Sequence, residues 1–282
     1  MLELFQTSEV QIRLVSFAVF FFGLAWLEAF RPFRRAIHSR FVRWINNLTL
    51  MLTGTLILRL LFPAATFSAA VITQENGWGV LAPWVPHSGF AIILWIIVLD
   101  LGVYLQHLLF HAIPLLWRLH RVHHSDEDLD LTTGLRFHPL EIVLSLGFKT
   151  GLVLILGPPL AAVIAFEVLL NATSMFSHSN ISLPRSLDRY LRWLVVTPGM
   201  HRIHHSPEPD DSRKNFGFNL SIWDRIFTTY QEPNGDNAPP KFGVGQFHST
   251  NELYVTQLLT QPFRGGVDSY PILRKQQEER HS

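Results

Sequence analysis

The sequence predicts an all-α protein, an integral membrane helical bundle of about four spans with a helical cap on the cytoplasmic side. Three observations lead to this fold class: long apolar runs, an uneven distribution of arginine among the loops, and histidine clusters at or beyond the ends of the apolar runs. We divide the chain into N-terminal spans and loops at 1–89, a central domain at 90–230 and a C-terminal tail of uncertain structure at 231–282.

The apolar runs predict the spans. Three runs are close to the length of about 20 residues that a membrane-crossing helix needs, and they occupy residues 14–30, 46–71 and 90–113. A fourth apolar region, 140–177, is interrupted by the sequence Gly-Pro-Pro at 157–159. Because proline cannot continue a helix, this region predicts two helices that meet at a tight turn, a hairpin in the membrane.

Arginine indicates which side of the membrane the loops face. Five arginines lie between residues 31 and 43, whereas the loop 74–89 contains neither lysine nor arginine. Cytoplasmic loops carry the excess of positive charge, so we expect 31–43 in the cytoplasm. The order of the spans then places the histidine clusters on the cytoplasmic side, in a bacterial cytoplasmic membrane or in the endoplasmic reticulum.

Composition excludes several classes of function. The formal net charge of +1 leaves no bulk positive charge to attract nucleic acid, so we expect no nucleic-acid partner. The chain contains no cysteine, which rules out disulfides, thiolate metal sites and iron–sulfur clusters.

Histidine is the chemically distinctive residue of this chain. HLLFH at 107–111 precedes two nearly identical hexapeptides, HRVHHS at 120–125 and HRIHHS at 201–206. Spacings of three and four place such rings on one side of a helix, where neutral imidazoles can bind a metal. Eight rings exceed the needs of one ion, so we predict a site for two metal ions. The eight are His107, His111, His120, His123, His124, His201, His204 and His205.

Four further residues are candidates for the same site. His138 and His178 flank the predicted hairpin, which would return both to the face that carries the three motifs and raise the number of rings to ten. Asp100 lies seven residues before His107 and hence on the same helical face, where it either holds a ligand histidine or makes a structural hydrogen bond inside the bundle. Asn171, seven before His178, is expected to support the site from outside or to pack between helices.

The ordered motifs HLLFH, HRVHHS, RFHPLE, FSHSN and HRIHHS, followed by NFGFNLSIWDRIFTTY at 215–230, resemble the fatty acid hydroxylase and sterol desaturase superfamily over roughly residues 90–230. The resemblance implies two non-haem iron ions bound by the eight motif histidines, with His138 and His178 matching the family's additional histidines. It also implies O₂-dependent hydroxylation, or desaturation, of a lipid such as a sterol, a fatty acyl chain or an ether lipid.

No side chain beyond the metal ligands is expected to be catalytic. The sequence shows no glycine fingerprint for a flavin or a nicotinamide cofactor, so we expect electrons from a separate donor, such as a cytochrome b5-like or ferredoxin-like protein.

Two other classes of protein use histidine clusters. A membrane metal transporter or sensor would place its ligands near the middle of the bilayer, whereas these motifs lie at one edge. A zinc hydrolase usually adds a carboxylate ligand or base, although zinc itself could occupy a site of this kind. Both remain alternatives that the motifs fit less well.

Overall fold

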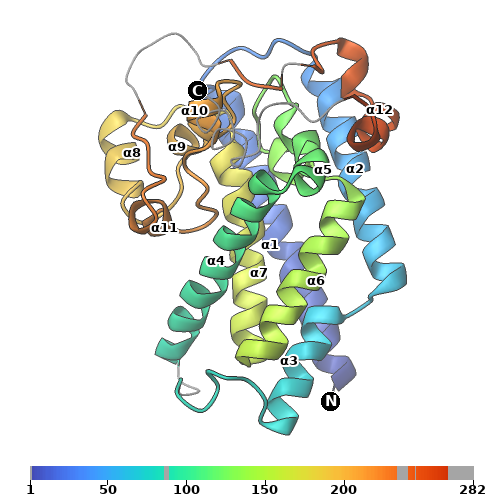
Figure 1. The fold of residues 1–282 in the computed structure, drawn as a ribbon, viewed down its shortest axis with the longest axis vertical. Helices are drawn as coiled ribbons and strands as arrows, with labels where there is room; N and C mark the ends of the chain where they lie inside the picture. Colours follow the sequence, from blue (N-terminus) through green and yellow to red (C-terminus); the bar gives the residue numbers. More distant parts are fainter. Residues whose placement is uncertain (1, 86–88, 234–240, 245, 266–282) are drawn as a thin grey trace, which may run out of the picture.

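The computed structural model describes residues 2–85, 89–233, 241–244 and 246–265, and within these ranges the chain is helical, with two isolated β-bridges and no strand. Within the described ranges, five helices are long and apolar enough to cross a membrane. They are α1 (Leu2–Phe30), α2 (Arg40–Leu61), α4 (Gly89–Ala112), α6 (Pro139–Leu156) and α7 (Leu160–His178). Figure 1 shows them packed as a bundle. The predicted all-α membrane bundle is confirmed, with five candidate spans where about four were expected.

Most of the short helices gather at the end of the bundle that lies opposite the N-terminus (Figure 1), and we call this region the cap. It comprises α5 (Pro114–His124), η1 (Thr133–Leu135), α8 (Arg185–Leu191), α9 (Pro198–His204), α10 (Pro209–Ser212), α11 (Ile222–Ile226), η2 (Thr250–Leu253), α12 (Val255–Thr260) and η3 (Gln261–Phe263).

The apolar run predicted at 46–71 is not one helix. Helix α2 ends at Leu61, and α3 (Ala65–Asn76) begins after Pro63. Proline lacks the backbone N–H that would continue the helix and restricts the residue before it, so the run breaks there. Helix α3 then packs against α6 and α7 at the end of the bundle away from the cap.

The hairpin predicted at 140–177 is confirmed as α6 and α7. Helix α6 stops at Gly157, whose φ of 76° lies in the left-handed region that glycine adopts most easily. The backbone of Gly157 also lies against the carbonyl oxygen of Trp78, which leaves no room for a Cβ atom. Pro159 then occupies the N-cap of α7.

Helix α7 lies at the centre of the bundle and packs against α1, α3 and α4. On one side Phe166 is buried with Leu99 and Val103 of α4, and on the other Met175 is buried with apolar side chains of α1. Burial of each such side chain contributes about 1.5–3 kcal/mol. This packing holds the cap ends of α4 and α7 in fixed positions, and both ends carry histidines.

A buried ionic network fixes the loop that follows α5. Arg43 of α2 is 1% exposed and donates to both carboxylate oxygens of Asp126, at 3.0 and 2.7 Å, and to Asp130 at 2.5 Å. Burial opposes ionisation of Asp126, but Arg43 and then Arg136 outweigh it and hold the pKa of this carboxyl well below its usual range. Asp126 is therefore ionised, and its pairing with Arg43 joins the loop to α2.

The described part of the C-terminal tail packs on the cap end of α2. The backbone N–H of Val255 donates to Asn46 Oδ1 at 2.8 Å, and Leu258 is buried with Leu50 and Val122. Of the predicted tail at 231–282, residues 234–240, 245 and 266–282 lie outside the described residues.

Candidate metal centre

Four helices, α4, α5, α7 and α9, bring the histidines together. The last turns of α4 carry His107 and His111, and Pro114 at the first position of α5 starts a new helix that turns back over them. Helix α9 begins with a capped first turn: Thr197 accepts from the backbone N–H of Met200 at 3.3 Å, and Pro198 occupies the first helical position.

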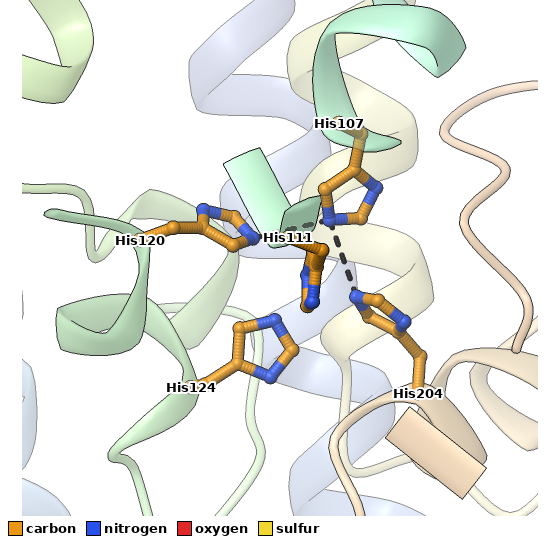
Figure 2. Close-up of side chains that lie close together, drawn as sticks. All are labelled: His107, His111, His120, His124 and His204. Carbon is orange, nitrogen blue, oxygen red and sulfur yellow. Dashed lines mark hydrogen bonds between the residues drawn. The ribbon is translucent and has the colours of Figure 1, made fainter. Parts of the chain in front are cut away.

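Five of these histidines form one group, shown in Figure 2. His107 and His111 come from α4, His120 and His124 from α5, and His204 from α9. One ring nitrogen from each lies within 4.8 Å of the others. All five side chains are buried. This set is the five-histidine group.

Four more histidines form the adjacent four-histidine group: His123, His178, His201 and His205. Their nitrogens also lie within 4.8 Å of one another. Nε2 of His178, the last residue of α7, lies 2.9 Å from Nε2 of His123 and 2.9 Å from Nε2 of His201. The rings of His124 and His205 stack with centroids 4.3 Å apart, so the two groups are in direct contact.

Hydrogen bonds from outside the groups orient four rings through their Nδ1 atoms. His107 and His204 reach the carbonyl oxygens of Phe216 and Lys214, at 2.8 and 2.9 Å. His178 reaches the carbonyl oxygen of Ser174 at 2.6 Å, and His120 reaches Glu141 Oε1 at 2.6 Å. Carbonyl and carboxylate oxygens only accept, so each Nδ1 carries the proton and each Nε2 keeps its lone pair.

These lone pairs point at one another, which neutral imidazoles alone do not favour. Nε2 of His107 lies 3.1 Å from Nε2 of His120 and 3.2 Å from Nε2 of His204, with no proton available between them. Two imidazole nitrogens that bind one ion at about 2.1 Å and at right angles lie about 3 Å apart. The Nε2 atoms of His111 and His124 are buried without any hydrogen-bond partner among the described residues. Both observations fit a cation in the five-histidine group.

The electrostatics of the cap histidines favour the metal-binding form. Burial lowers the pKa of His120 to about 3. Burial first, and neighbouring imidazoles second, lower the pKa values of the other cap histidines well below their usual range: His123, His124, His201, His204 and His205. The rings are therefore neutral near pH 7, with a nitrogen lone pair free for a metal.

Three of the predicted site residues lie outside the two histidine groups. His138 is at the N-cap of α6, where Nδ1 accepts from the backbone N–H of Leu140 at 3.2 Å and Nε2 lies 3.2 Å from the carbonyl oxygen of Leu259. Asp100 accepts from the backbone N–H groups of Asn219 and Leu220 and from the indole of Trp223, so it makes the structural hydrogen bonds and holds no histidine. Asn171 donates to the carbonyl oxygen of Glu167 within its own helix.

Glu141 is a site residue that the sequence analysis missed. It lies three residues after His138 in the first turn of α6. The helix dipole stabilises a carboxylate at this position, so its presence in the sequence did not by itself indicate a functional site. Its Oε1 holds His120, and its Oε2 is buried without a hydrogen-bond partner among the described residues. The available signal was an ionisable residue at the start of an apolar span.

The segment 214–224 supports the site through its backbone. Asn215 adopts a left-handed φ of 55°, so the carbonyls on either side of it reach His204 and His107. The carboxylate of Asp224 accepts from the backbone N–H groups of Phe216 and Gly217, at 2.8 and 2.9 Å. Burial raises the pKa of Asp224, and these hydrogen bonds oppose the shift. Asp224 thus fixes the carbonyl that orients His107.

The arginine of each hexapeptide has its own role. Arg121 donates to the carbonyl oxygens of Gln261, at 2.6 Å, and of Arg264. Arg202 donates to the carbonyl oxygens of Ser179, at 3.0 Å, and Ile181, at 2.8 Å. Each arginine ties its histidine-bearing helix to a neighbouring segment, which accounts for the repetition of HRxHH rather than HxxHH alone.

A cavity of about 520 Å³ lies beneath the five-histidine group, among α1, α2, α4, α6 and α7. His107, His120 and Glu141 line it on the side of the cap, and much of its remaining surface is apolar. Leu14 and Leu52 also line it and are 63% and 59% exposed, so the cavity opens on the outer surface of the bundle at α1 and α2.

A comparison with known protein families matches residues 92–229 to the description "Fatty acid hydroxylase". Residues 92–229 belong to the fatty acid hydroxylase family. All nine histidines of the two groups lie within this fatty acid hydroxylase domain, together with Glu141 and the segment 214–224.

Curated relatives extend the similarity. The chain is 28% identical over 174 residues to ornithine lipid hydroxylase OlsE of Rhizobium tropici, a match that covers 62% of this chain and 50% of that protein. It is 29% identical over 241 residues to alkylglycerol monooxygenase of Danio rerio, covering 85% of this chain and 50% of the relative. The human alkylglycerol monooxygenase is 32% identical over 154 residues, covering 54% and 32%.

The chain therefore spans about half the length of the first two relatives. No solved structure shows a significant match to it.

Proposed function

We propose that this protein is a membrane-bound lipid hydroxylase that uses O₂ and two iron ions held by the five- and four-histidine groups. The single observation that carries the proposal is the position of these groups: nine buried histidines in two adjacent clusters, one of which forms the end of a largely apolar cavity that opens on the side of the bundle. Family membership of residues 92–229 and the names of the relatives support the same activity.

The chain's own residues would bind and place the reactants. A lipid chain would enter the cavity from the bilayer past Leu14 and Leu52 and extend toward His107 and His120. A volume of about 520 Å³ lies within the range of about 300–1,000 Å³ typical of small-molecule sites. The hydrogen bonds at Nδ1 would hold the rings with Nε2 directed inward, and burial of the groups would exclude bulk water.

Bound iron supplies the oxygen-activating redox chemistry that an unactivated C–H bond requires and that side chains lack. In the overall reaction one atom of O₂ enters a C–H bond to give a hydroxyl group, and the other leaves as water. Two electrons from a separate redox protein and two protons balance it. We propose hydroxylation rather than desaturation because the relatives are named hydroxylase and monooxygenase.

The substrate would be a lipid that offers one long apolar chain to the cavity. The names of the relatives suggest ether-linked glycerols and amino-acid-containing lipids as the first candidates. We place the cap in the cytoplasm because the five arginines between 31 and 43 lie at that end of the bundle and the loop at the other end has none. A cytochrome b5-like or ferredoxin-like donor would dock there.

The test combines metal analysis with isotopic labelling. The purified protein, reconstituted with iron in liposomes, is supplied with a reduced ferredoxin or cytochrome b5, ¹⁸O₂ and either an alkylglycerol or an ornithine lipid. We expect two irons per chain and one ¹⁸O atom in the product lipid. The matched variants are His204→Ala, which should lose iron and turnover, and His138→Ala, which should keep both. An iron-loaded protein that consumes no O₂ with either lipid class, or a product that carries oxygen from water, would contradict the proposal.

A further inference from the structure

Part of the cap has an apolar outer surface that no described segment covers. It is formed by α8, α11 and the residues that follow them, and we call it the α8–α11 surface. Its members are Leu187, Tyr190, Trp193, Leu194, Ile222, Ile226 and Phe227, which are 39% to 71% exposed. A cap bathed in water on all sides would not favour so many large apolar side chains close together on its exterior.

The segment that carries this surface reaches down along the bundle. The backbone of Asn219 and Leu220 and the indole of Trp223 donate to Asp100, which lies twelve residues before the end of α4. At a rise of about 1.5 Å per residue this is about 18 Å below the cap end of α4. Figure 1 shows α11 beside the upper half of α4, outside the bundle.

A second helix and a ring contact also place this segment beside the bundle. Thr173 of α7, five residues before the end of that helix, hydrogen-bonds to Asn219 Oδ1, so this contact lies about 8 Å below the cap end of α7. The ring of Phe227 stacks on Tyr104 of α4 with centroids 5.3 Å apart. The segment thus lies within the length of two helices that are long enough to span a membrane.

The two halves of the surface are joined rigidly. The N–H of Val196 donates to the carbonyl of Asn219 at 3.0 Å, and an isolated antiparallel bridge pairs Val195 with Leu220. Arg225 lies over the ring of Trp193 at 4.6 Å and over that of Tyr230 at 4.0 Å. Aromatic rings next to arginine, above aliphatic side chains, are typical of residues at the boundary between headgroups and acyl chains.

We propose that the α8–α11 surface is inserted into the cap-side leaflet of the membrane, so that the catalytic cap is a half-embedded element rather than a freely solvated one. Its occupant is the acyl-chain region of lipids already in contact with α4, whose Leu105 and Leu109 are 41% and 43% exposed. Asp100 is the anchor of this insertion: a buried carboxylate whose partners are all supplied by the inserted segment and not by a metal ligand. The inference concerns membrane contact alone and does not depend on the proposed activity.

The absence of cysteine makes a direct test possible, because a single introduced cysteine carries the only spin label. Leu194→Cys and Ile226→Cys report on the surface. Phe22→Cys, on the exposed side of α1, serves as the lipid reference, and Ser249→Cys, exposed at the N-cap of η2 in the cap, as the aqueous reference. Each label is measured in phosphatidylcholine liposomes for collision with O₂, which concentrates in the bilayer, and with a water-soluble nickel chelate.

We expect both surface labels to give an O₂-to-nickel collision ratio close to that of Phe22 and several-fold above that of Ser249. A ratio equal to that of Ser249 would overturn the proposal, because the surface would then be in water. Immobile labels that collide with neither reagent would also overturn it, since they would indicate a protein interface. Circular dichroism of each labelled variant confirms that it is folded before the comparison is made.

Discussion

At the scale of single residues, each histidine of the two groups is useful only in one orientation. Carbonyl oxygens orient three rings, and a side-chain carboxylate, Glu141, orients one. Removal of such a hydrogen-bond partner typically lowers metal affinity or activity by about 10- to 100-fold. Glu141 is therefore the most informative residue to change, because a side chain can be replaced and a carbonyl cannot.

Glu141→Ala should lower iron affinity by about 10- to 100-fold because His120 loses the acceptor that fixes its tautomer. Glu141→Gln keeps an accepting oxygen and should recover part of that loss. Iron titration followed by its absorption spectrum measures both. Leu144→Ala, on the exposed side of the same helix, is the control and should bind iron as the parent does. Equal affinities in all four proteins would show that Glu141 does not position His120.

His178 and His138 should respond in opposite ways. His178→Ala removes the ring whose Nε2 lies within 3.1 Å of three others, so about one of two irons should be lost. His138→Ala removes a helix N-cap and should cost about 1 kcal/mol of stability while both irons remain. Metal content per chain and thermal melting separate the two effects. Loss of iron from His138→Ala would return this residue to the list of ligands.

The residue scale also shows where sequence reasoning stops. The eight motif histidines could be assigned to one site because the spacings place their rings on common faces, and His178 because the predicted hairpin returns it to the same end of the bundle. His138 could not be separated from them, since a histidine before a proline at a helix start is equally suited to capping. Asp100 had two interpretations, and only the distant segment 219–223 decides between them.

At the scale of elements, the site depends on short segments that have no histidine. The segment 214–224 presents two carbonyl groups to the five-histidine group, and Asp224 holds that segment in shape. The loop after α5 is held in a similar way by Arg43 from α2. Both arrangements place buried charge outside the site to fix the backbone beside it.

Asp224→Asn should weaken iron binding without touching a ligand. The new amide turns an N–H toward one of the two backbone N–H groups that the carboxylate accepted, which leaves a buried donor unpaired at a cost of about 1–3 kcal/mol. The melting temperature and the iron affinity should fall together. Glu208→Gln, an exposed acidic residue of the cap, is the matched control. An unchanged iron affinity would mean that the carbonyl of Phe216 keeps its place without Asp224.

Arg43→Met should be more damaging than any of these substitutions to overall stability. It leaves Asp130 buried without its cation and Asp126 with Arg136 alone, at 3.7 Å, and breaking such a buried pair typically costs about 3–5 kcal/mol. Arg59→Met, at the other end of α2 on an exposed side chain, is the control. Denaturation in mixed micelles measures the difference. A loss of less than about 1 kcal/mol, the usual value for a surface pair, would show that water replaces the guanidinium.

At the scale of the whole molecule, the two histidine groups draw on both the bundle and the cap. Helices α4 and α7 are spans, and α5 and α9 belong to the cap. Metal ions would therefore join two parts of the protein that are also connected by loops, by the hydrogen bonds of Asp100 to the segment 219–223, and by the packing of the tail on α2. Helical periodicity and apolar length predicted the bundle, because each span is determined locally by about 20 residues.

The arrangement of the cap could not be predicted in the same way. Its helices α8 to α11 are four to seven residues long, too short for a periodic signal, and α11 lies next to α4 through contacts more than 100 residues apart in sequence. The break between α2 and α3 was missed because apolar residues continue on both sides of Pro63.

Removal of metal should loosen the cap and leave the bundle intact. A ligand at about 1,000 times its dissociation constant stabilises the folded state by about 4 kcal/mol, and without it the facing lone pairs lose their shared cation. Hydrogen exchange should rise in α5 and α9 and stay low in α1 and α6. The measurement compares iron-loaded protein with protein treated with a chelator. Equal exchange in α5 before and after chelation would show that the cap is held by its own packing.

The distance along the chain between the facing rings has a consequence for biogenesis. His204 meets His107 across 97 positions, with the α6–α7 hairpin between them in sequence. During synthesis the first four contributors to the five-histidine group emerge and insert long before the fifth has been translated. A metal ion held by all five rings would therefore be completed only after the spans have been inserted, so metal supply would act on completed chains rather than on nascent ones.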